Sequence, residues 1–367
     1  MSWRLGLTRL AAVVGGDLQA AARRAGGGRR LWEAGSRDLE RWMRLDAEGL
    51  RRVIECRGAM HPRRELAAMS ERSIGWIPGD DARMPAAIGA LVDAPFGLFT
   101  LGRPLDAVMP PDRPVVAIVG SRRATAFGAR FTERIAGALA ARGAVVVSGL
   151  ALGIDAAAHQ GALDAGRATV AVLGGGVDVV YPRRHRALRE RIVAEGVLLS
   201  EYWPGTSPAP WRFPARNRIV AGLADAVVVV EAGERSGALI TADFALELGR
   251  PVLAVPGAPG SAASAGCHTL LRAGAALCET EEDVIVEVPA AMWDAPATPG
   301  APVELDGVEA SIYRLLQTEP LRSDELVERL GVGAAGVAAA LARLEIGGLV
   351  LRGQAQRFWA APLRGAA

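Results

Sequence analysis

The chain has 367 residues, half of them hydrophobic, with 42 basic and 40 acidic side chains and a formal net charge of +2. This length and apolar content argue against a disordered chain and predict two or three domains with at least one large core. All 42 basic residues are arginine, which excludes lysine chemistry, and the near-neutral total confines any anion-binding site to a local patch.

Residues 1–73 mix Ala, Arg, Leu and Glu at helical spacing, interrupted at "GGGRR" (26–30), and predict a small helical domain. The opening stretch is too short and too charged for a signal peptide, and no window is apolar enough to span a membrane. Cys56, Cys267 and Cys278 lack paired spacing and are expected to be reduced thiols. We therefore expect a cytoplasmic protein that makes no membrane contact.

Residues 74–110 are rich in Pro and Gly and predict a connector packed on the next domain. Over residues 111–289, short β-branched runs alternate with segments of helical length. Strands that are apolar on both faces are typical of a parallel sheet covered by helices on both sides, so we predict an α/β, Rossmann-like, doubly wound domain. The expected strands are 115–119, 144–147, 168–173, 197–200, 225–232 and 251–257.

The composition changes again near the C-terminal end of this domain. Residues 290–303 are Pro- and Ala-rich and predict a linker. Residues 304–367 show three helical segments, one of which is expected to start at Ser323, followed by two short strands. Three helices and a hairpin are typical of a winged-helix domain.

The carboxyl ends of the predicted parallel strands share glycine and small polar residues. Ligands of doubly wound sheets bind at these ends, so the shared bias favours one composite site. After the first strand, "GSRRAT" places Gly120 and Ser121 beside Arg122, with a helix expected to start near Phe127. We expect the amides of this helix start, with the arginine, to hold a phosphate. The glycine spacing of a dinucleotide-binding loop is missing.

A second basic segment, "YPRRHRALRER" (181–191), follows the glycine turn at 174–176. It is either a solvated helix face or part of the same crevice, to which the turn would bring Arg183. Asp155 and His159, four residues apart, can share a helix face. Without a third ligand or a nucleophile they favour a turn-fixing role over a metal or general-base role, and the sequence predicts neither a metal nor a cofactor.

The segment "FPARNRIVAG" (213–222) carries Arg216, Asn217 and Arg218 just before a buried strand. Residues two apart on a helix point in different directions, so we expect one arginine to bind a ligand and the other to brace the fold. Ser236, Gly237 and Thr241 open a later helix, where they suit either a sugar-phosphate backbone or a helix cap.

Aromatic residues are few in this chain, yet several fall in or beside the basic loops. Arginines on phosphates with rings under bases are what single-stranded nucleic acid requires. Some of these rings must instead be core residues. The rings in question are Phe127, Tyr181, Trp203, Trp211 and Phe213.

In order, "VAIVGSR", "VVSGLALGIDAAAHQGAL", "AVLGGGVDVVYP", "FPARNRIVAGLADAVVVVEA" and "SGALITADFALELGR" resemble the DNA-processing protein A family, DprA or Smf. The resemblance is dense over 115–288 and thinner over 80–102. It implies a SAM-like helical domain over 1–73, single-stranded DNA as ligand, the recombinase RecA as partner, a homodimer formed through the Rossmann-like domain, and no catalytic activity. By motif, the DNA site would use Gly120, Ser121, Arg122 and Arg183, joined by Arg216, Asn217, Arg218, Ser236, Gly237 and Thr241.

The chain departs from the family pattern at His185 and His268, where Asn is usual. In the winged helix, the expected recognition helix offers Arg343 as its only cation. A helix that reads a major groove needs polar and basic side chains, so we predict that this domain adds little DNA affinity.

The sequence leaves two functions open. The first is a non-enzymatic protein that binds and protects incoming single-stranded DNA and loads RecA onto it during natural transformation. The alternative is a nucleotide-processing hydrolase similar to the phosphoribohydrolases, for which Glu231 and Glu247 are the candidate carboxylates. The phosphate-binding loop of those enzymes is missing from "SGALITADFALE", which favours the first.

Overall fold

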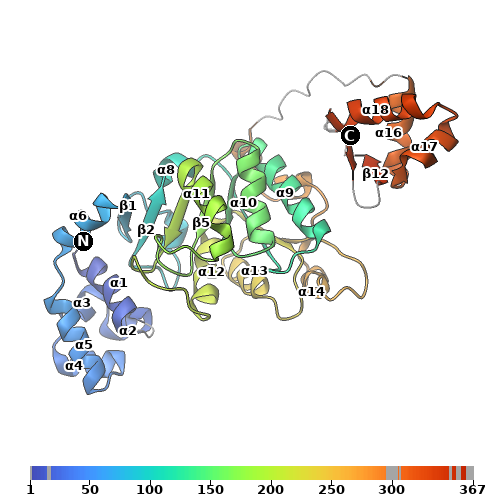
Figure 1. Ribbon diagram of the computed structural model, residues 1–367. Coiled ribbons are helices and arrows are strands. Elements are labelled where there is room, and N and C mark those ends of the chain that lie inside the picture. Colours follow the sequence, from blue (N-terminus) through green and yellow to red (C-terminus); the bar gives the residue numbers. More distant parts are fainter. Residues whose placement is uncertain are drawn as a thin grey trace. The chain divides into compact units, whose positions relative to one another are not determined.

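A computed structural model describes residues 2–14, 18–294, 305, 307–346, 349–352 and 357–360. The chain forms two compact units, Met1–Asp294 and Ala295–Ala367 (Figure 1). Residues 295–303 of the predicted linker lie outside the described residues. The finer boundaries expected at residues 73 and 110 stay predictions.

The first unit begins with short helices, as the spacing of its apolar residues predicts. Leucines recurring every three or four residues pack into a small core that contains Leu7, Leu10 and Leu39. Asp46 caps the fifth helix by accepting the N–H of Gly49 at 2.7 Å. These helices are α1 (Ser2–Val14), α2 (Leu18–Ala25), α3 (Gly28–Glu33), α4 (Ser36–Met43), α5 (Ala47–Gly58) and α6 (Pro62–Glu71).

A nine-stranded sheet follows, in the order β1-β2-β6-β5-β4-β3-β7-β8-β9. Strands β3 to β9 run parallel, and the six expected strands are all confirmed. The short parallel strand β9 was not predicted. The bounds are β3 (Val115–Gly120), β4 (Val145–Ser148), β5 (Thr169–Val172), β6 (Val197–Ser200), β7 (Ala226–Val230), β8 (Val252–Ala254) and β9 (Ala276–Leu277).

The predicted connector contributes two strands to this sheet. Strand β1 (Ile74–Pro78) pairs antiparallel with β2 (Gly97–Gly102), which pairs antiparallel with β6. The glycines that made this segment look like a loop instead make room for rings. A Cβ on Gly97 would lie 2.3 Å from the indole of Trp76.

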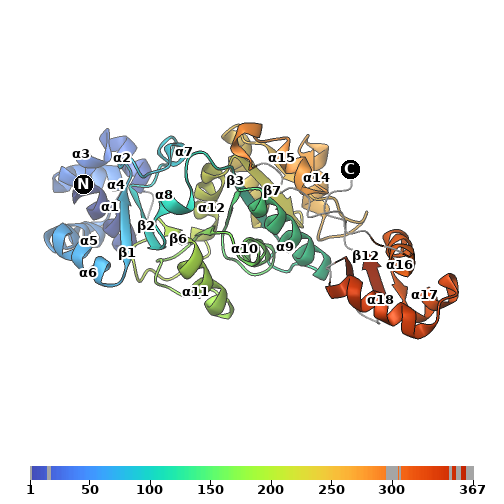
Figure 2. The same cartoon turned by 90° about the horizontal axis from the view of Figure 1, so that it is seen from above.

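Helices cover both faces of the sheet (Figures 1 and 2). Along β3, Val115, Ala117 and Val119 face one core and Val116 and Ile118 face the other. The face of Val115, Ala117 and Val119 is covered by α7 (Ala86–Gly89), α8 (Leu105–Val108), α12 (Arg212–Leu223), α13 (Gly237–Glu247) and α14 (Ala265–Arg272). The opposite face is covered by α9 (Ala126–Ala141), α10 (Ile154–Asp164) and α15 (Glu281–Ile285). Helix α11 (Arg186–Glu195) packs beside β2 and β6. The doubly wound α/β class is confirmed.

The second unit has the predicted winged-helix elements. A core around Ile312, Leu326 and Leu341 joins three helices to a small antiparallel sheet of order β10-β12-β11. Helix α17 starts at Ser323, as expected. The bounds are α16 (Gly307–Thr318), β10 (Leu321–Arg322), α17 (Ser323–Leu330), α18 (Ala334–Ile346), β11 (Val350–Arg352) and β12 (Arg357–Ala360).

Candidate nucleic-acid interface

A crevice lies at the carboxyl ends of β3, β4 and β5, where doubly wound sheets bind their ligands. Its enclosed volume is about 60 Å³, far below the roughly 300 Å³ of even a small ligand pocket. It therefore suits a ligand that lies along the surface better than one that is engulfed. Its lining includes Arg122, Gly149, Gly174, Tyr181 and Phe213.

Several exposed arginines in or next to the crevice segments have no polar protein partner among the described residues. None of the described residues forms a hydrogen bond or ion pair with the guanidinium groups of Arg122 or Arg183, and both side chains are exposed. Arg122 lines the crevice, and Arg183 directly follows the lining residues Tyr181 and Pro182. Three further exposed arginines, which the family motifs did not indicate, also have no hydrogen bond or ion pair to their guanidinium groups among the described residues: Arg123, Arg184 and Arg186.

Aromatic rings form the wall beside these cations. The guanidinium carbon of Arg122 lies 4.8 Å from the ring centroid of Phe213, and that ring lies 5.6 Å from the ring of Tyr181 at an angle of 32°. Tyr181 is 47% exposed. Gly174 permits this packing, because a Cβ there would lie 2.9 Å from the Phe213 ring. A cation and two rings thus adjoin at the crevice wall.

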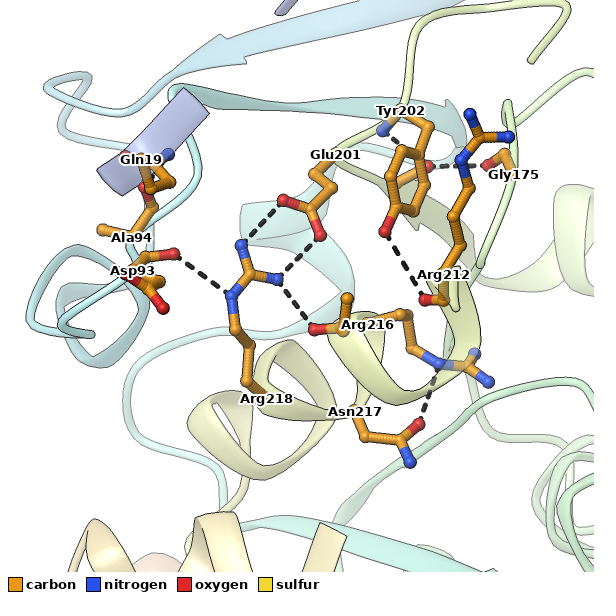
Figure 3. Close-up of polar contacts among 12 residues, drawn as sticks. Gln19, Asp93, Ala94, Gly175, Glu201, Tyr202, Arg212, Arg216, Asn217 and Arg218 are labelled. Atoms are coloured by element: carbon orange, nitrogen blue, oxygen red, sulfur yellow. Dashed lines mark hydrogen bonds and ion pairs between the residues drawn. The ribbon is translucent and has the colours of Figure 1, made fainter. Parts of the chain in front are cut away.

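Arg216 is buried beneath the crevice. Its Nη1 donates to the carbonyl of Gly149 at 2.7 Å and also to that of Val172, and its Nε donates to Asn217 Oδ1 at 3.2 Å. Figure 3 shows Arg216 beside Asn217 on α12. Burial lowers the pKa of this guanidinium. Arg216 therefore ties together the ends of β4 and β5.

Arg218 points elsewhere and is also committed to the protein (Figure 3). Its two Nη atoms each lie 2.7 Å from a carboxylate oxygen of Glu201, and its Nε donates to the carbonyl of Asp93 at 3.1 Å. Burial works to lower the pKa of Arg218, but Glu201 outweighs it and the pKa is raised. The expectation was that one of the two arginines braces the fold; the structure provides protein partners for both.

The remaining predicted residues lie on α12 and in or next to α13. Asn217 donates to the carbonyl of Gly237 at 3.1 Å, and Ser236 accepts the N–H of Ala238 at 3.3 Å as a helix cap. Thr241 is 1% exposed. None of Asn217, Ser236, Gly237 and Thr241 is among the residues lining the crevice.

A carboxylate occupies the start of α9, where a phosphate was expected. Glu231 Oε2 accepts the N–H of Thr125 at 2.8 Å, and Oε1 accepts the Thr125 hydroxyl. That hydroxyl in turn accepts the N–H of Gly128 at 3.1 Å. Two amides at this helix start, those of Thr125 and Gly128, therefore already have protein acceptors, and the phosphate contact expected there stays a prediction. Gly120 has a structural requirement too, since a Cβ would lie 1.8 Å from the Val230 carbonyl oxygen.

Asp155 and His159 have separate roles. Asp155 Oδ2 accepts the N–H groups of Gly149 and Ala151 at 3.1 and 3.3 Å, which confirms that it fixes a turn. His159 Nδ1 lies 2.8 Å from Thr169 Oγ1, and burial lowers the pKa of His159 to about 3. Among the described residues no group of three His, Cys, Asp or Glu side chains is placed to hold a metal.

The two histidines that depart from the family pattern each contact a loop carbonyl. A ring nitrogen of His185 lies 3.2 Å from the Leu150 oxygen, and one of His268 lies 3.0 Å from the Gly257 oxygen. An imidazole N–H therefore braces the loop at both positions.

In the second unit, Arg343 on α18 is paired with Glu309. Cys56, Cys267 and Cys278 are buried and unpaired, and no helix in the described ranges is long and apolar enough to cross a membrane.

Two family models match this chain. Residues 76–289 match the family model of DNA recombination-mediator protein A, and residues 296–355 match that of the DprA winged helix domain. A DNA processing protein DprA of Mycobacterium tuberculosis is 47% identical over 265 residues, covering 70% of this chain and 66% of that relative, so this chain spans about two thirds of its length.

Two solved structures are also similar. The X-ray structure of DNA processing protein A from Streptococcus pneumoniae matches with a TM-score of 0.65 and 33% identity, over 79% of this chain and 98% of that one. A structure of DNA processing protein A from Helicobacter pylori, described for its single-stranded DNA binding mode, matches with a TM-score of 0.50 and 33% identity, over 55% of this chain and 91% of that one.

Proposed function

The chain belongs to the DNA recombination-mediator protein A (DprA) family, and from that premise we propose that it binds single-stranded DNA along the arginine-lined crevice. The observation that carries this proposal is that some arginines of this unit are free at the surface while others are bonded within the protein. Arg122 and Arg183 at the crevice lack polar protein partners within the described residues, whereas Arg216 and Arg218 are committed to the fold. Unpaired guanidinium groups on a rigid sheet edge suit a phosphate backbone.

The rings support a single strand over a duplex. A single strand exposes the faces of its bases, which can stack on rings such as the half-exposed Tyr181, whereas a duplex hides them. The cations supply affinity without sequence information. The related Helicobacter pylori protein was solved for its single-stranded DNA binding mode, and this similarity supports the same ligand here.

In this proposal Arg216 and Arg218 shape the site without touching DNA. Arg216 holds the turn at Gly149 that lines the crevice, and Arg218 anchors α12 through Glu201. Gly120 and Ser121 would place Arg122. Asn217 would join α12 to Gly237, Ser236 would cap α13, and Thr241 would stay buried within it.

We further propose that the bound strand is passed to the recombinase RecA in the cytoplasm during natural transformation, that the protein acts as a homodimer through its Rossmann-like domain, and that it catalyses no reaction. The family membership supports the recombination role. The carboxylates of the hydrolase alternative lend it no support: Glu231 is bound to Thr125, and Glu247 is exposed at the far end of α13.

A salt titration with matched single- and double-stranded oligonucleotides tests the proposal. If Arg122 and Arg183 and their exposed neighbours Arg123, Arg184 and Arg186 each neutralise one phosphate, the slope of log affinity against log salt for a single strand should be roughly −3.5. Equal affinity for duplex, or binding that is indifferent to salt, would overturn it. Release of free base from a nucleoside monophosphate would instead establish the hydrolase.

A further inference from the structure

One residue holds both ends of the loop that carries the crevice arginine Arg122. At the first end, Ser121 N–H donates to the backbone carbonyl of Glu231 at 2.7 Å. At the other end, the N–H of Thr125 donates to the Glu231 carboxylate at 2.8 Å, and the Thr125 hydroxyl donates to it as well. Residues 122–124 therefore span between two attachments to Glu231.

The backbone of Glu231 adopts an uncommon conformation to do this. Its φ is +51°, in the left-handed region that favours glycine, although the residue is only 7% exposed. Such a conformation is strained for a residue with a side chain and persists only where the surroundings enforce it, and residues of this kind cluster at functional sites. Leu150, which lines the same crevice, is also left-handed, with φ of +55°.

The carboxylate is enclosed against the first turn of α9. A Cβ on Gly128 would lie 2.4 Å from the Glu231 carboxyl carbon, so the glycine lets the acid sit directly on the helix backbone. Within the loop, Ser121 Oγ accepts the N–H of Arg123 at 3.0 Å. The carboxylate of Glu231 is thus the principal tie at the helix end of the loop.

We propose that Glu231 is a positioning residue for DNA binding, which fixes the 121–125 loop so that the Arg122 guanidinium is held over Phe213 and ready for a phosphate. The inference rests on the proposed function. Pre-ordering matters because an arginine on a loose loop loses backbone freedom when it binds, and that loss subtracts from its affinity for the phosphate.

A double-mutant cycle tests it, with a fluorescent oligothymidylate as the probe and anisotropy as the readout. Glu231→Ala and Arg122→Ala should each weaken binding by about tenfold, the value of one charged hydrogen bond. The double variant should bind as weakly as either single variant, because Glu231 acts through Arg122. Glu247→Ala, which removes one exposed carboxylate from the same unit, controls for the change in net charge and should bind no more weakly than the wild type.

Two conservative variants keep the test decisive if Glu231→Ala does not fold. Thr125→Val removes the hydroxyl donor and keeps the N–H contact, and Glu231→Gln keeps one acceptor. Each should weaken binding by roughly two- to fivefold, with no further effect in the Arg122→Ala background. The midpoint of thermal unfolding of each variant is measured as well, to show that the variant is folded.

The outcomes separate this inference from the function on which it rests. If the wild type does not bind the oligonucleotide, the proposed function fails and the inference fails with it. If the wild type binds and Arg122→Ala weakens it, but folded Glu231 and Thr125 variants bind normally, only the inference is overturned. Weakening that adds to that of Arg122→Ala also overturns it, because Glu231 would then act independently.

Discussion

Arg218 and Glu201 form a two-point ion pair, in which each Nη of the arginine lies 2.7 Å from a different carboxylate oxygen. The side chains are 12% and 17% exposed. The pair joins α12 to the segment after β6, and the Arg218 Nε extends the link to the carbonyl of Asp93. A motif arginine that looked available for DNA is therefore a structural element of the first unit.

Breaking this pair should destabilise the protein. Arg218→Met leaves the Glu201 carboxylate largely buried without its partner, which should lower the free energy of unfolding by about 2–4 kcal/mol. Urea denaturation measures this. Arg184→Met, at an exposed arginine, should stay within about 0.5 kcal/mol of the wild type. An Arg218→Met protein as stable as the wild type would show that the ion pair contributes nothing.

The crevice arginines should show the opposite behaviour. Arg122→Ala and Arg183→Ala should each weaken single-stranded DNA binding and reduce the salt slope by about 0.7, because each removes one phosphate contact. Their midpoints of thermal unfolding should not change, since neither guanidinium has a polar partner within the described residues. Loss of affinity with an unchanged salt slope would contradict the assignment of phosphate contacts.

The two predicted site glycines should respond differently to an added methyl group. A Cβ on Gly120 would lie 1.8 Å from the Val230 carbonyl oxygen, whereas one on Gly237 meets nothing within 4 Å. Gly120→Ala should therefore lower the free energy of unfolding by more than about 2 kcal/mol, because β3 and β7 must separate. Gly237→Ala should raise it by about 0.4–1 kcal/mol, since the unfolded chain loses freedom. Chemical denaturation of both variants distinguishes a packing role from one in DNA contact.

His159 should make stability depend on pH. Its pKa in the folded protein, about 3, lies below its ordinary value of 6.5. As the pH falls below about 6.5, the unfolded chain binds a proton at His159 and the folded protein does not. The free energy of unfolding therefore decreases from about pH 6.5 down to about pH 3, by up to roughly 1.4 kcal/mol per pH unit. Urea denaturation at several pH values should show that the free energy of unfolding changes less steeply with pH in His159→Gln than in the wild type. The matched control, His61→Gln at an exposed histidine, should keep the wild-type slope; equal slopes in all three proteins would contradict the assignment.

The second unit should contribute little to DNA affinity. Arg343 on α18 is already paired with Glu309, so Arg343→Ala should weaken single-stranded DNA binding less than twofold. Anisotropy titrations against Arg183→Ala provide the comparison. A loss as large as that of Arg183→Ala would show that α18 contacts DNA.

Local pattern was sufficient for most of the fold. The six buried strands and the winged helix follow from apolar runs and helical spacing, because burial on both faces of a sheet leaves no polar alternation. The pattern failed for β1 and β2, whose glycines and prolines are typical of loops. Gly97 lies in a strand because the ring of Trp76 fills the space that its side chain would take, and that ring belongs to another strand.

The sequence by itself determined the class of the fold, the family, and the segments that meet at the sheet edge, because these depend on the order and periodicity of residues along the chain. Only the tertiary structure decided which arginines are free. Arg122 and Arg216 are alike as sequence, but one is exposed at the crevice and the other is bonded to Gly149 and Val172. Whether a charge is available depends on the partners that folding brings within hydrogen-bond distance, here carbonyl groups 44 and 67 residues away along the chain, and no local pattern contains that information.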